Sequence, residues 1–168
     1  MHVSVVVIGR DTGPRLRLAL AGYERAVAQA ARHGIATEIV VVDDGSTDDT
    51  PRILEEAKAT LPLTALRNTP SAGIAEARNR GAAAASGELL LFMDGDVLLS
   101  EEGIVAHVEA HRERRAPLIV RGSTAHLRCT RPLLDPEAGT PFPGQEAAVA
   151  RIGHELPRYR VSAAQVRK

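Results

Sequence analysis

A short apolar run that ends in two acids constrains this chain more than any other stretch. The run extends from Leu89 to Met93 and is bounded by Gly87 and by the sequence Asp94-Gly95-Asp96. Five large apolar residues between a glycine and acids are typical of a strand buried on both faces of a sheet. We therefore expect the two carboxylates at the carboxyl end of this strand, where open α/β sheets bind their ligands.

The spacing of these two acids suggests a ligand. Asp94 and Asp96 are two residues apart, so in an extended chain their side chains point the same way. Two convergent carboxylates repel each other unless a cation lies between them, and hard oxygen ligands suit Mg²⁺ or Mn²⁺. The pattern predicts a divalent metal that holds a phosphate group. The alternative is a polar turn after the strand.

Strand and helix patterns alternate along the first 122 residues. Apolar runs predict strands, and apolar residues at helical spacing predict helices between them. The expected strands are 3–8, 38–44, 63–66, 89–93 and 117–122, and the expected helices are 14–33, 50–59, 71–85 and 100–115. This alternation predicts an α/β domain, with a Rossmann-like, mainly parallel sheet and helices on both faces.

Local signals refine three of these helices. Gly34 fits the end of the first helix, and Thr50 followed by Pro51 fits the start of the second. The third helix is rich in alanine and carries a narrow face of mostly small residues, which would let it lie close to a sheet. The residues of this face are Ile74, Ala77, Gly81 and Ala85.

The order of the strands follows from their handedness. Right-handed crossovers place the two strands that end in acids on either side of the first strand. The crevice at the carboxyl end of the sheet is then expected to be lined by Asp43, Asp44, Asp94 and Asp96.

Composition narrows the class of protein. The chain has 168 residues, of which 44% are hydrophobic and 25% charged, and its formal net charge is +0. We therefore expect one folded domain with a packed core and no binding of nucleic acid through bulk positive charge. The single Cys129 excludes an internal disulfide and a cysteine-rich zinc site.

The start of the chain carries no pattern of a signal peptide, and no apolar run reaches the length of a bilayer. We expect a cytoplasmic protein, and membrane association through segments outside this chain stays open. After Gly122 the regular pattern gives way to proline-rich loops. Residues 1–122 are thus the expected α/β core, and residues 123–168 an irregular or truncated acceptor-side segment.

Several common phosphate and hydrolase motifs are missing from the sequence. It contains no Walker A motif, no Gly-x-Gly-x-x-Gly after the first strand, and no Gly-x-Ser-x-Gly elbow. The remaining interpretation is a site that binds a phosphorylated ligand through a metal.

Four blocks in register resemble the family 2 glycosyltransferases. They are 3–7, 38–48, 72–81 and 87–96, and together they cover about the first two-thirds of the chain. The resemblance implies the GT-A fold. It also implies transfer of a sugar, with inversion, from a nucleotide-diphosphate sugar, a UDP-sugar favoured, to an acceptor hydroxyl. The sequence does not identify the sugar, the acceptor or the oligomeric state.

The resemblance also implies roles for individual residues. Asp43 and Asp44 would bind the nucleotide, with one of the pair capping the turn that follows. Arg78 and Asn79 match a block that faces the base, and Arg78 would contact the base or fix the acids. The cofactor would be Mn²⁺ or Mg²⁺. Asp96 would ligate it, and Asp94 would hold the ribose or the metal.

The sequence departs from the family pattern at two places. The usual base lies in a Glu-Asp block, and no Glu-Asp dipeptide occurs here, so the catalytic base is unknown. Weak candidates are Glu146 and Glu155, with Asp135 and Glu137 nearby. In addition, Gly9-Arg10-Asp11 stands where members have Pro-Thr-Tyr-Asn, and Asp11 would still approach the base.

Two alternatives stay open. The chain could be a catalytically incomplete module that binds a nucleotide sugar and needs a missing segment or partner. The run before Val97 also resembles the nucleophile motif of haloacid-dehalogenase-like phosphatases, but the only lysine after it is Lys168. His107 and His111 lie four residues apart, and without a third ligand we expect them to be surface residues.

Overall fold

The computed structural model describes residues 1–112 and 118–122. Strands and helices alternate along this part of the chain, as the sequence predicts. The elements are β1 (His2–Gly9), α1 (Gly13–Arg32), β2 (Ala36–Asp43), α2 (Thr50–Ala57), β3 (Leu63–Arg67), α3 (Ile74–Ala84), β4 (Leu89–Asp94) and α4 (Gly103–Arg112). None of the helices in the described ranges is both long and apolar enough to cross a bilayer.

The described strands form one parallel sheet in the order β3-β2-β1-β4. β1 is the central strand. Its backbone amides and carbonyls form hydrogen bonds with β2 on one edge and with β4 on the other. In this register Gly9 lies opposite Asp43, and Ile8 lies opposite Asp94. The two strands that end in acids therefore flank β1, as the crossover rule predicts.

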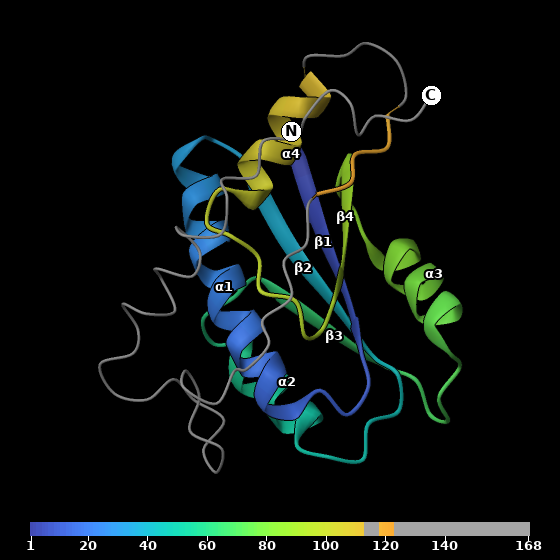
Figure 1. The fold of residues 1–168 in the computed structure, drawn as a ribbon. Helices are drawn as coiled ribbons and strands as arrows, with labels where there is room; N and C mark the ends of the chain where they lie inside the picture. Colours follow the sequence, from blue (N-terminus) through green and yellow to red (C-terminus); the bar gives the residue numbers. More distant parts are fainter. Residues whose placement is uncertain (113–117, 123–168) are drawn as a thin grey trace.

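Helices cover both faces of the sheet, which confirms the predicted α/β layers (Figure 1). α1, α2 and α4 lie on one face, and α3 lies on the other. The larger core fills the first face, where Val5 and Ile39 of the sheet meet Tyr23 of α1 and Ile104 of α4. A much smaller core lies under α3.

The first helix follows its sequence pattern closely. Leu16, Leu20, Tyr23 and Ala30 are buried on one side, as their spacing predicts. Gly34 ends the helix with a φ of 68°, where its amide donates to the Ala31 carbonyl at 3.0 Å. The next amide reaches back to Ala30, which completes a Schellman motif that only a residue tolerant of positive φ forms easily.

One face of β4 is more exposed than predicted. The sequence predicts burial on both faces, but Leu90 is 36% exposed and Phe92 is 45% exposed. Both lie on the face of the sheet where α3 packs, but the main contacts of α3 with the sheet are to β1 and β2. Since β4 is the edge of the described sheet, no described helix shields this face, and the prediction was wrong there.

Several element boundaries also differ from the sequence prediction. Residues 118–122 form no strand, although a strand was expected over 117–122. α2 and α3 are shorter than expected, and Ile74 is 65% exposed rather than packed on the sheet. The predicted segment 123–168 lies outside the described residues, so the boundary at residue 122 stays a prediction.

Thr50 does not cap its own helix as expected. Asp49 occupies the N-cap position of α2, and the Thr50 hydroxyl instead accepts hydrogen bonds from the amides of Thr12 and Gly13. Thr50 does support the start of a helix, as expected, but that helix is α1 rather than α2. This contact joins the loops that follow β1 and β2.

We predict that Gly81→Ala destabilises the fold. An added Cβ would clash with Val6 Cγ1 and lie 3.2 Å from Val42 Cγ2, and both valines are buried and stiff. Overpacking typically costs about 1–3 kcal/mol, and better helix propensity returns about 1 kcal/mol, so we expect a net loss of about 1 kcal/mol in the free energy of unfolding. Urea denaturation measures it.

The matched control is Ala83→Leu, which adds volume to the exposed side of the same helix. We expect this control to change the free energy of unfolding by less than about 0.5 kcal/mol. Equal stability of Gly81→Ala and wild type would contradict the close packing of α3 on the sheet.

Candidate functional site

The carboxyl ends of the parallel strands gather the predicted site residues at one edge of the sheet. Arg67, Asp43 and Gly9 lie side by side in register at the ends of β3, β2 and β1. Gly95, directly after β4, donates its amide to the Ile8 carbonyl at 2.7 Å. A Cβ on Gly95 would lie only 3.2 Å from that carbonyl oxygen, so a glycine fits this close approach of two backbones best.

The Asp-Gly-Asp sequence is a turn rather than an extended segment. β4 ends at Asp94, Gly95 and Asp96 form a turn, and the Val97 amide donates to the Asp94 carbonyl at 3.1 Å. The argument that two residues of an extended chain point the same way was therefore wrong here. The hydrogen bond from Gly95 to β1 ends the strand and forces the chain to bend.

Each carboxylate of this turn pairs with an arginine on a different helix. Arg78 Nη2 of α3 lies 3.0 Å from Asp94 Oδ1, and Arg15 Nη1 of α1 lies 3.6 Å from Asp96 Oδ2. The side chains of Asp94 and Asp96 are 57% and 46% exposed. Since α3 and α1 cover opposite faces of the sheet, the two guanidinium groups approach the turn from opposite sides.

Asp44 is held in a different way. Its carboxylate accepts four hydrogen bonds, from Asn68 Nδ2 and Ser71 Oγ at 2.6 Å each and from the amides of Ala72 and Gly73 at 2.8 and 2.9 Å. These bonds, first those from Asn68 and Ser71, hold the pKa of Asp44 well below its usual range. Asp44 therefore fixes the loop that leads into α3.

Asp43 is buried and also supports a loop. Its Oδ1 accepts the Ser46 amide at 2.9 Å, which stabilises the turn after β2. Its Oδ2 lies 3.5 Å from Arg67 Nε and has no hydrogen-bond donor among the described residues. We expected one acid of the pair to hold a loop, and in the structure both do. Their roles in nucleotide binding stay predictions, and Asp43 has the oxygen with spare hydrogen-bonding capacity.

Asp11 joins the loop after β1 to the loop after β2. Its Oδ1 accepts the amides of Thr47 at 2.7 Å and Asp48 at 3.3 Å, and its own amide donates to Ser46 Oγ. The hydrogen bond from the Thr47 amide, above all, lowers the pKa of Asp11. Asp11 adopts a φ of 50°, which the Asp type tolerates better than most. Its expected approach to a base stays a prediction.

Several residues around the site were missed by the sequence analysis. Asn68 and Ser71 hold Asp44, and Arg80 in turn bonds the carbonyl of Arg67 and the side chain of Asn68. A signal was present, since polar residues follow the predicted strand 63–66 at the end where ligands bind. Arg15 also had a signal: a cation in the first turn of a helix is disfavoured by the helix dipole. Asn79, which was predicted, is exposed on α3.

Helix α1 fixes the segment that follows the acidic turn. The hydroxyl of Tyr23 donates to the Val97 carbonyl at 3.3 Å, and a Cβ on Gly22 would lie 2.6 Å from Leu98 Cδ1. Burial, and then the charges of Asp94 and Asp96, raise the pKa of Tyr23, so its proton stays on the hydroxyl. The segment directly after the acidic turn is therefore held against α1.

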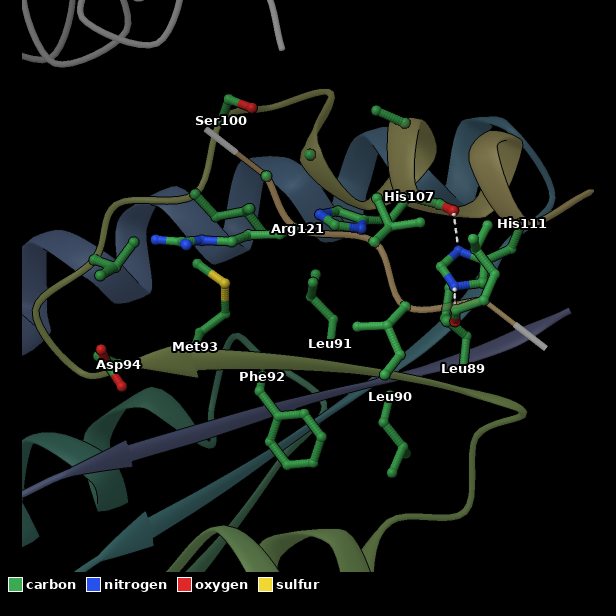
Figure 2. A pocket seen from close by; sticks show the side chains of 18 of the residues that line it. Leu89, Leu90, Leu91, Phe92, Met93, Asp94, Ser100, His107, His111 and Arg121 are labelled. Carbon is green, nitrogen blue, oxygen red and sulfur yellow. Dashed lines mark hydrogen bonds between the residues drawn. The ribbon is translucent and has the colours of Figure 1, made fainter. Parts of the chain in front are cut away.

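A pocket of about 1000 Å³ lies between β4 and α4, with Asp94 and Arg78 among its lining residues. Figure 2 shows Leu91 and Met93 directed toward α4, whereas Phe92 points to the opposite face of the strand. The lining is mostly apolar. This pocket extends from the acidic turn along the length of β4.

The two histidines of α4 line this pocket and are half-buried, so their prediction as surface residues was wrong. His111 Nδ1 lies 2.7 Å from the His107 carbonyl, and its Nε2 lies 3.3 Å from the Leu118 carbonyl (Figure 2). Burial lowers the pKa of His107. Across residues 1–112 and 118–122, no three acidic, histidine or cysteine side chains gather as metal ligands.

The donor set fits a magnesium-like or manganese-like ion at Asp94 and Asp96. Such ions bind through one or two carboxylates and take their other ligands from water and substrate phosphates. The carboxylates of Asp94 and Asp96 are about half exposed, so their oxygens are accessible to a cation. The candidate bases Glu146, Glu155, Asp135 and Glu137 lie outside the described residues.

Comparison with known proteins gives consistent matches. The family model described as "Glycosyl transferase family 2" matches residues 20–135. A Bacillus subtilis protein described as "Uncharacterized glycosyltransferase YfnE" is 38% identical over 85 residues, which are 51% of this chain and 21% of that protein. A dolichol-phosphate mannosyltransferase of Pyrococcus furiosus is 38% identical over 80 residues, 48% of this chain and 23% of that protein.

Solved structures agree with the fold. Staphylococcus aureus TarS 1-349 in complex with UDP-GlcNAc matches with a TM-score of 0.62 and 22% identity, over 80% of this chain and 39% of that one. The mannosyltransferase PcManGT of Pyrobaculum calidifontis, in complex with GDP-Man and Mn²⁺, matches with a TM-score of 0.57 and 26% identity, over 70% and 33%. The expected GT-A fold is thus confirmed. The chain spans about a fifth of the length of the curated relatives that it matches.

We predict that Asp44→Asn destabilises the fold in a pH-dependent way. Two donors would face the new amide group, and we expect a loss of about 2 kcal/mol in the free energy of unfolding at pH 7. Because the folded-state pKa of Asp44 is depressed, its stabilisation is complete above about pH 4 and is lost as the pH falls further. Urea denaturation of both proteins at several pH values measures this difference.

The exposed Asp49, which pairs with Arg52, supplies the control variant Asp49→Asn. We expect this control to change the free energy of unfolding by less than about 1 kcal/mol. A difference between wild type and Asp44→Asn that stays constant down to about pH 2 would contradict the assignment of a depressed pKa.

Proposed function

The chain belongs to glycosyl transferase family 2, and from this premise we propose that it transfers a sugar from a nucleoside-diphosphate sugar to an acceptor hydroxyl. We further propose inversion at the anomeric carbon, a UDP-sugar as the favoured donor, and dependence on Mn²⁺ or Mg²⁺. Two observations support a nucleotide-sugar donor. The acids lie at the carboxyl end of the sheet, and the similar structures of TarS and PcManGT are complexes with UDP-GlcNAc and GDP-Man.

One observation carries this proposal: the site has two kinds of acid. Asp43 and Asp44 are 2% and 7% exposed and are held by loop donors. Asp94 and Asp96 are about half exposed, and each is paired with one arginine. Asp43 and Asp44 can hold the loops around a ligand in one conformation. Asp94 and Asp96 can bind and release a cation.

In this proposal Asp94 and Asp96 would hold the metal, which would supply positive charge to neutralise the diphosphate of the leaving group. Arg78 orients Asp94 through their ion pair at 3.0 Å. Asp43 and Asp44 hold the loops that border the nucleotide, and Asp43 Oδ2 is a buried oxygen that has no hydrogen-bond donor among the described residues. The catalytic base stays unknown, and its weak candidates Glu146 and Glu155, with Asp135 and Glu137 nearby, lie outside the described residues.

The pocket beside β4 supports the proposal, because it would offer the sugar and the acceptor a space next to Asp94. Asp94 and Arg78 belong to its lining, and most of the other lining residues are apolar residues of β4 and of the segments 97–99 and 118–120. An apolar wall would exclude water from the reacting carbon, which protects the donor against hydrolysis.

An alternative is supported by one fact: the sequence has no Glu-Asp block to supply the base. In that case the chain would bind a nucleotide sugar without transferring it. Membership of the family sets aside the haloacid-dehalogenase-like phosphatase.

We predict that the chain binds UDP in the presence of Mn²⁺ and that Asp96→Asn weakens this binding by about tenfold or more, because one charged metal ligand is lost. Isothermal titration calorimetry with UDP and with GDP, in Mn²⁺ and in EDTA, measures this. The control Glu109→Gln removes one exposed negative charge from α4 and leaves the affinity unchanged. Absence of UDP and GDP binding to wild type would overturn the proposed function.

Turnover distinguishes the two candidate functions. The transferase should release UDP from a UDP-sugar when a sugar or lipid acceptor is supplied. The binding module should bind UDP with Mn²⁺ and release none, whatever acceptor is offered. Product release is followed by a coupled assay for UDP.

A further inference from the structure

We infer that Arg15 is the internal counter-cation that couples metal binding to diphosphate binding. It pairs with Asp96 in the structure, and it transfers to the diphosphate when a divalent cation takes that carboxylate. This inference rests on the proposed function, since it assumes that Asp96 binds a metal and that the ligand carries a diphosphate.

The ion pair itself has the properties of an exchangeable contact. Arg15 Nη1 and Asp96 Oδ2 are 3.6 Å apart, and the two side chains are 59% and 46% exposed. This distance is longer than that of a charge-assisted hydrogen bond, and such exposed pairs are weak. A divalent cation and the guanidinium would compete for the same carboxylate, and the cation carries twice the charge.

The backbone under Arg15 is fixed, so only its side chain needs to move. The amides of Thr12 and Gly13 donate to Thr50 Oγ1, and this holds the start of α1. Tyr23, further along the same helix, anchors the Val97 carbonyl just beyond the acidic turn. The distance between the start of α1 and the turn is therefore set by the fold.

The position of Arg15 in the first turn of α1 adds a second reason for the transfer. The amino end of a helix carries partial positive charge, which disfavours a cation and favours an anion. While Arg15 faces Asp96, the carboxylate relieves this repulsion. If a metal took the carboxylate, the guanidinium of Arg15 and the amino end of α1 would lack an anionic partner. A diphosphate offers the oxygens that a guanidinium binds in pairs.

Arg78 differs from Arg15 in this respect. It lies on α3, at the opposite face of the sheet, and contacts Asp94 at 3.0 Å, which is within hydrogen-bond distance. It is suited to orient its acid, whereas the longer contact of Arg15 is suited to release. The two carboxylates of the turn are thus balanced by cations of two different roles.

The test compares Arg15→Ala with Arg32→Ala in calorimetric titrations. Arg32 is a matched control, because it lies at the other end of the same helix and forms an exposed pair with Glu101 at 3.8 Å. We expect Mn²⁺ alone to bind Arg15→Ala about two- to fivefold more tightly than wild type, since the competing cation is gone. We expect UDP, at saturating Mn²⁺, to bind it about threefold or more weakly. Arg32→Ala should match wild type in both titrations.

The outcomes separate this inference from the proposed function. If wild type binds neither Mn²⁺ nor UDP, both are overturned. If wild type binds UDP with Mn²⁺ and either shift is missing from Arg15→Ala, the inference alone is overturned. Thermal unfolding checks that the variants fold, and Arg15→Gln, which keeps a long polar side chain without the charge, replaces Arg15→Ala if its melting temperature falls below that of Arg32→Ala.

Discussion

The structure depends on the parallel pairing of β1 with a neighbour on each edge. β1 is buried along almost its whole length, so every amide and carbonyl in it must find a backbone partner. The pairing with β2 and β4 satisfies them and also fixes the register, which brings Gly9 beside Asp43 and Ile8 beside Asp94. The site is therefore placed by the same hydrogen bonds that hold the core together.

The loops at the carboxyl end of the sheet are held by acids rather than by apolar packing. Asp44 gathers four donors from the segment that leads into α3, and Asp11 and Asp43 hold the loops after β1 and β2. A buried carboxylate is costly without donors, so the buried Asp43 and Asp44 require their loops to adopt one conformation. Asp94 and Asp96, in contrast to Asp43 and Asp44, are about half exposed.

Electrostatic balance then links both faces of the sheet to one turn. Arg78 reaches Asp94 from α3, and Arg15 reaches Asp96 from α1, so the turn is balanced from two helices that otherwise do not share a core. Tyr23 holds the segment that follows. The two ion pairs are exposed, whereas the backbone on either side of the turn is held by hydrogen bonds to β1 and α1.

The sequence by itself determined the order of the strands and helices through β4 and α4, the parallel α/β class, the flanking of β1 by two strands that end in acids, and the family. These follow from local patterns, because apolar runs and helical spacing are properties of neighbouring residues. Only the tertiary structure decided that Asp44 is a loop anchor, that Thr50 supports α1, that Phe92 is exposed, and that Asp96 pairs with Arg15. The physical reason is distance along the chain: the donors and cations that settle the role of each acid come from other helices and loops, and no local pattern shows where they will lie.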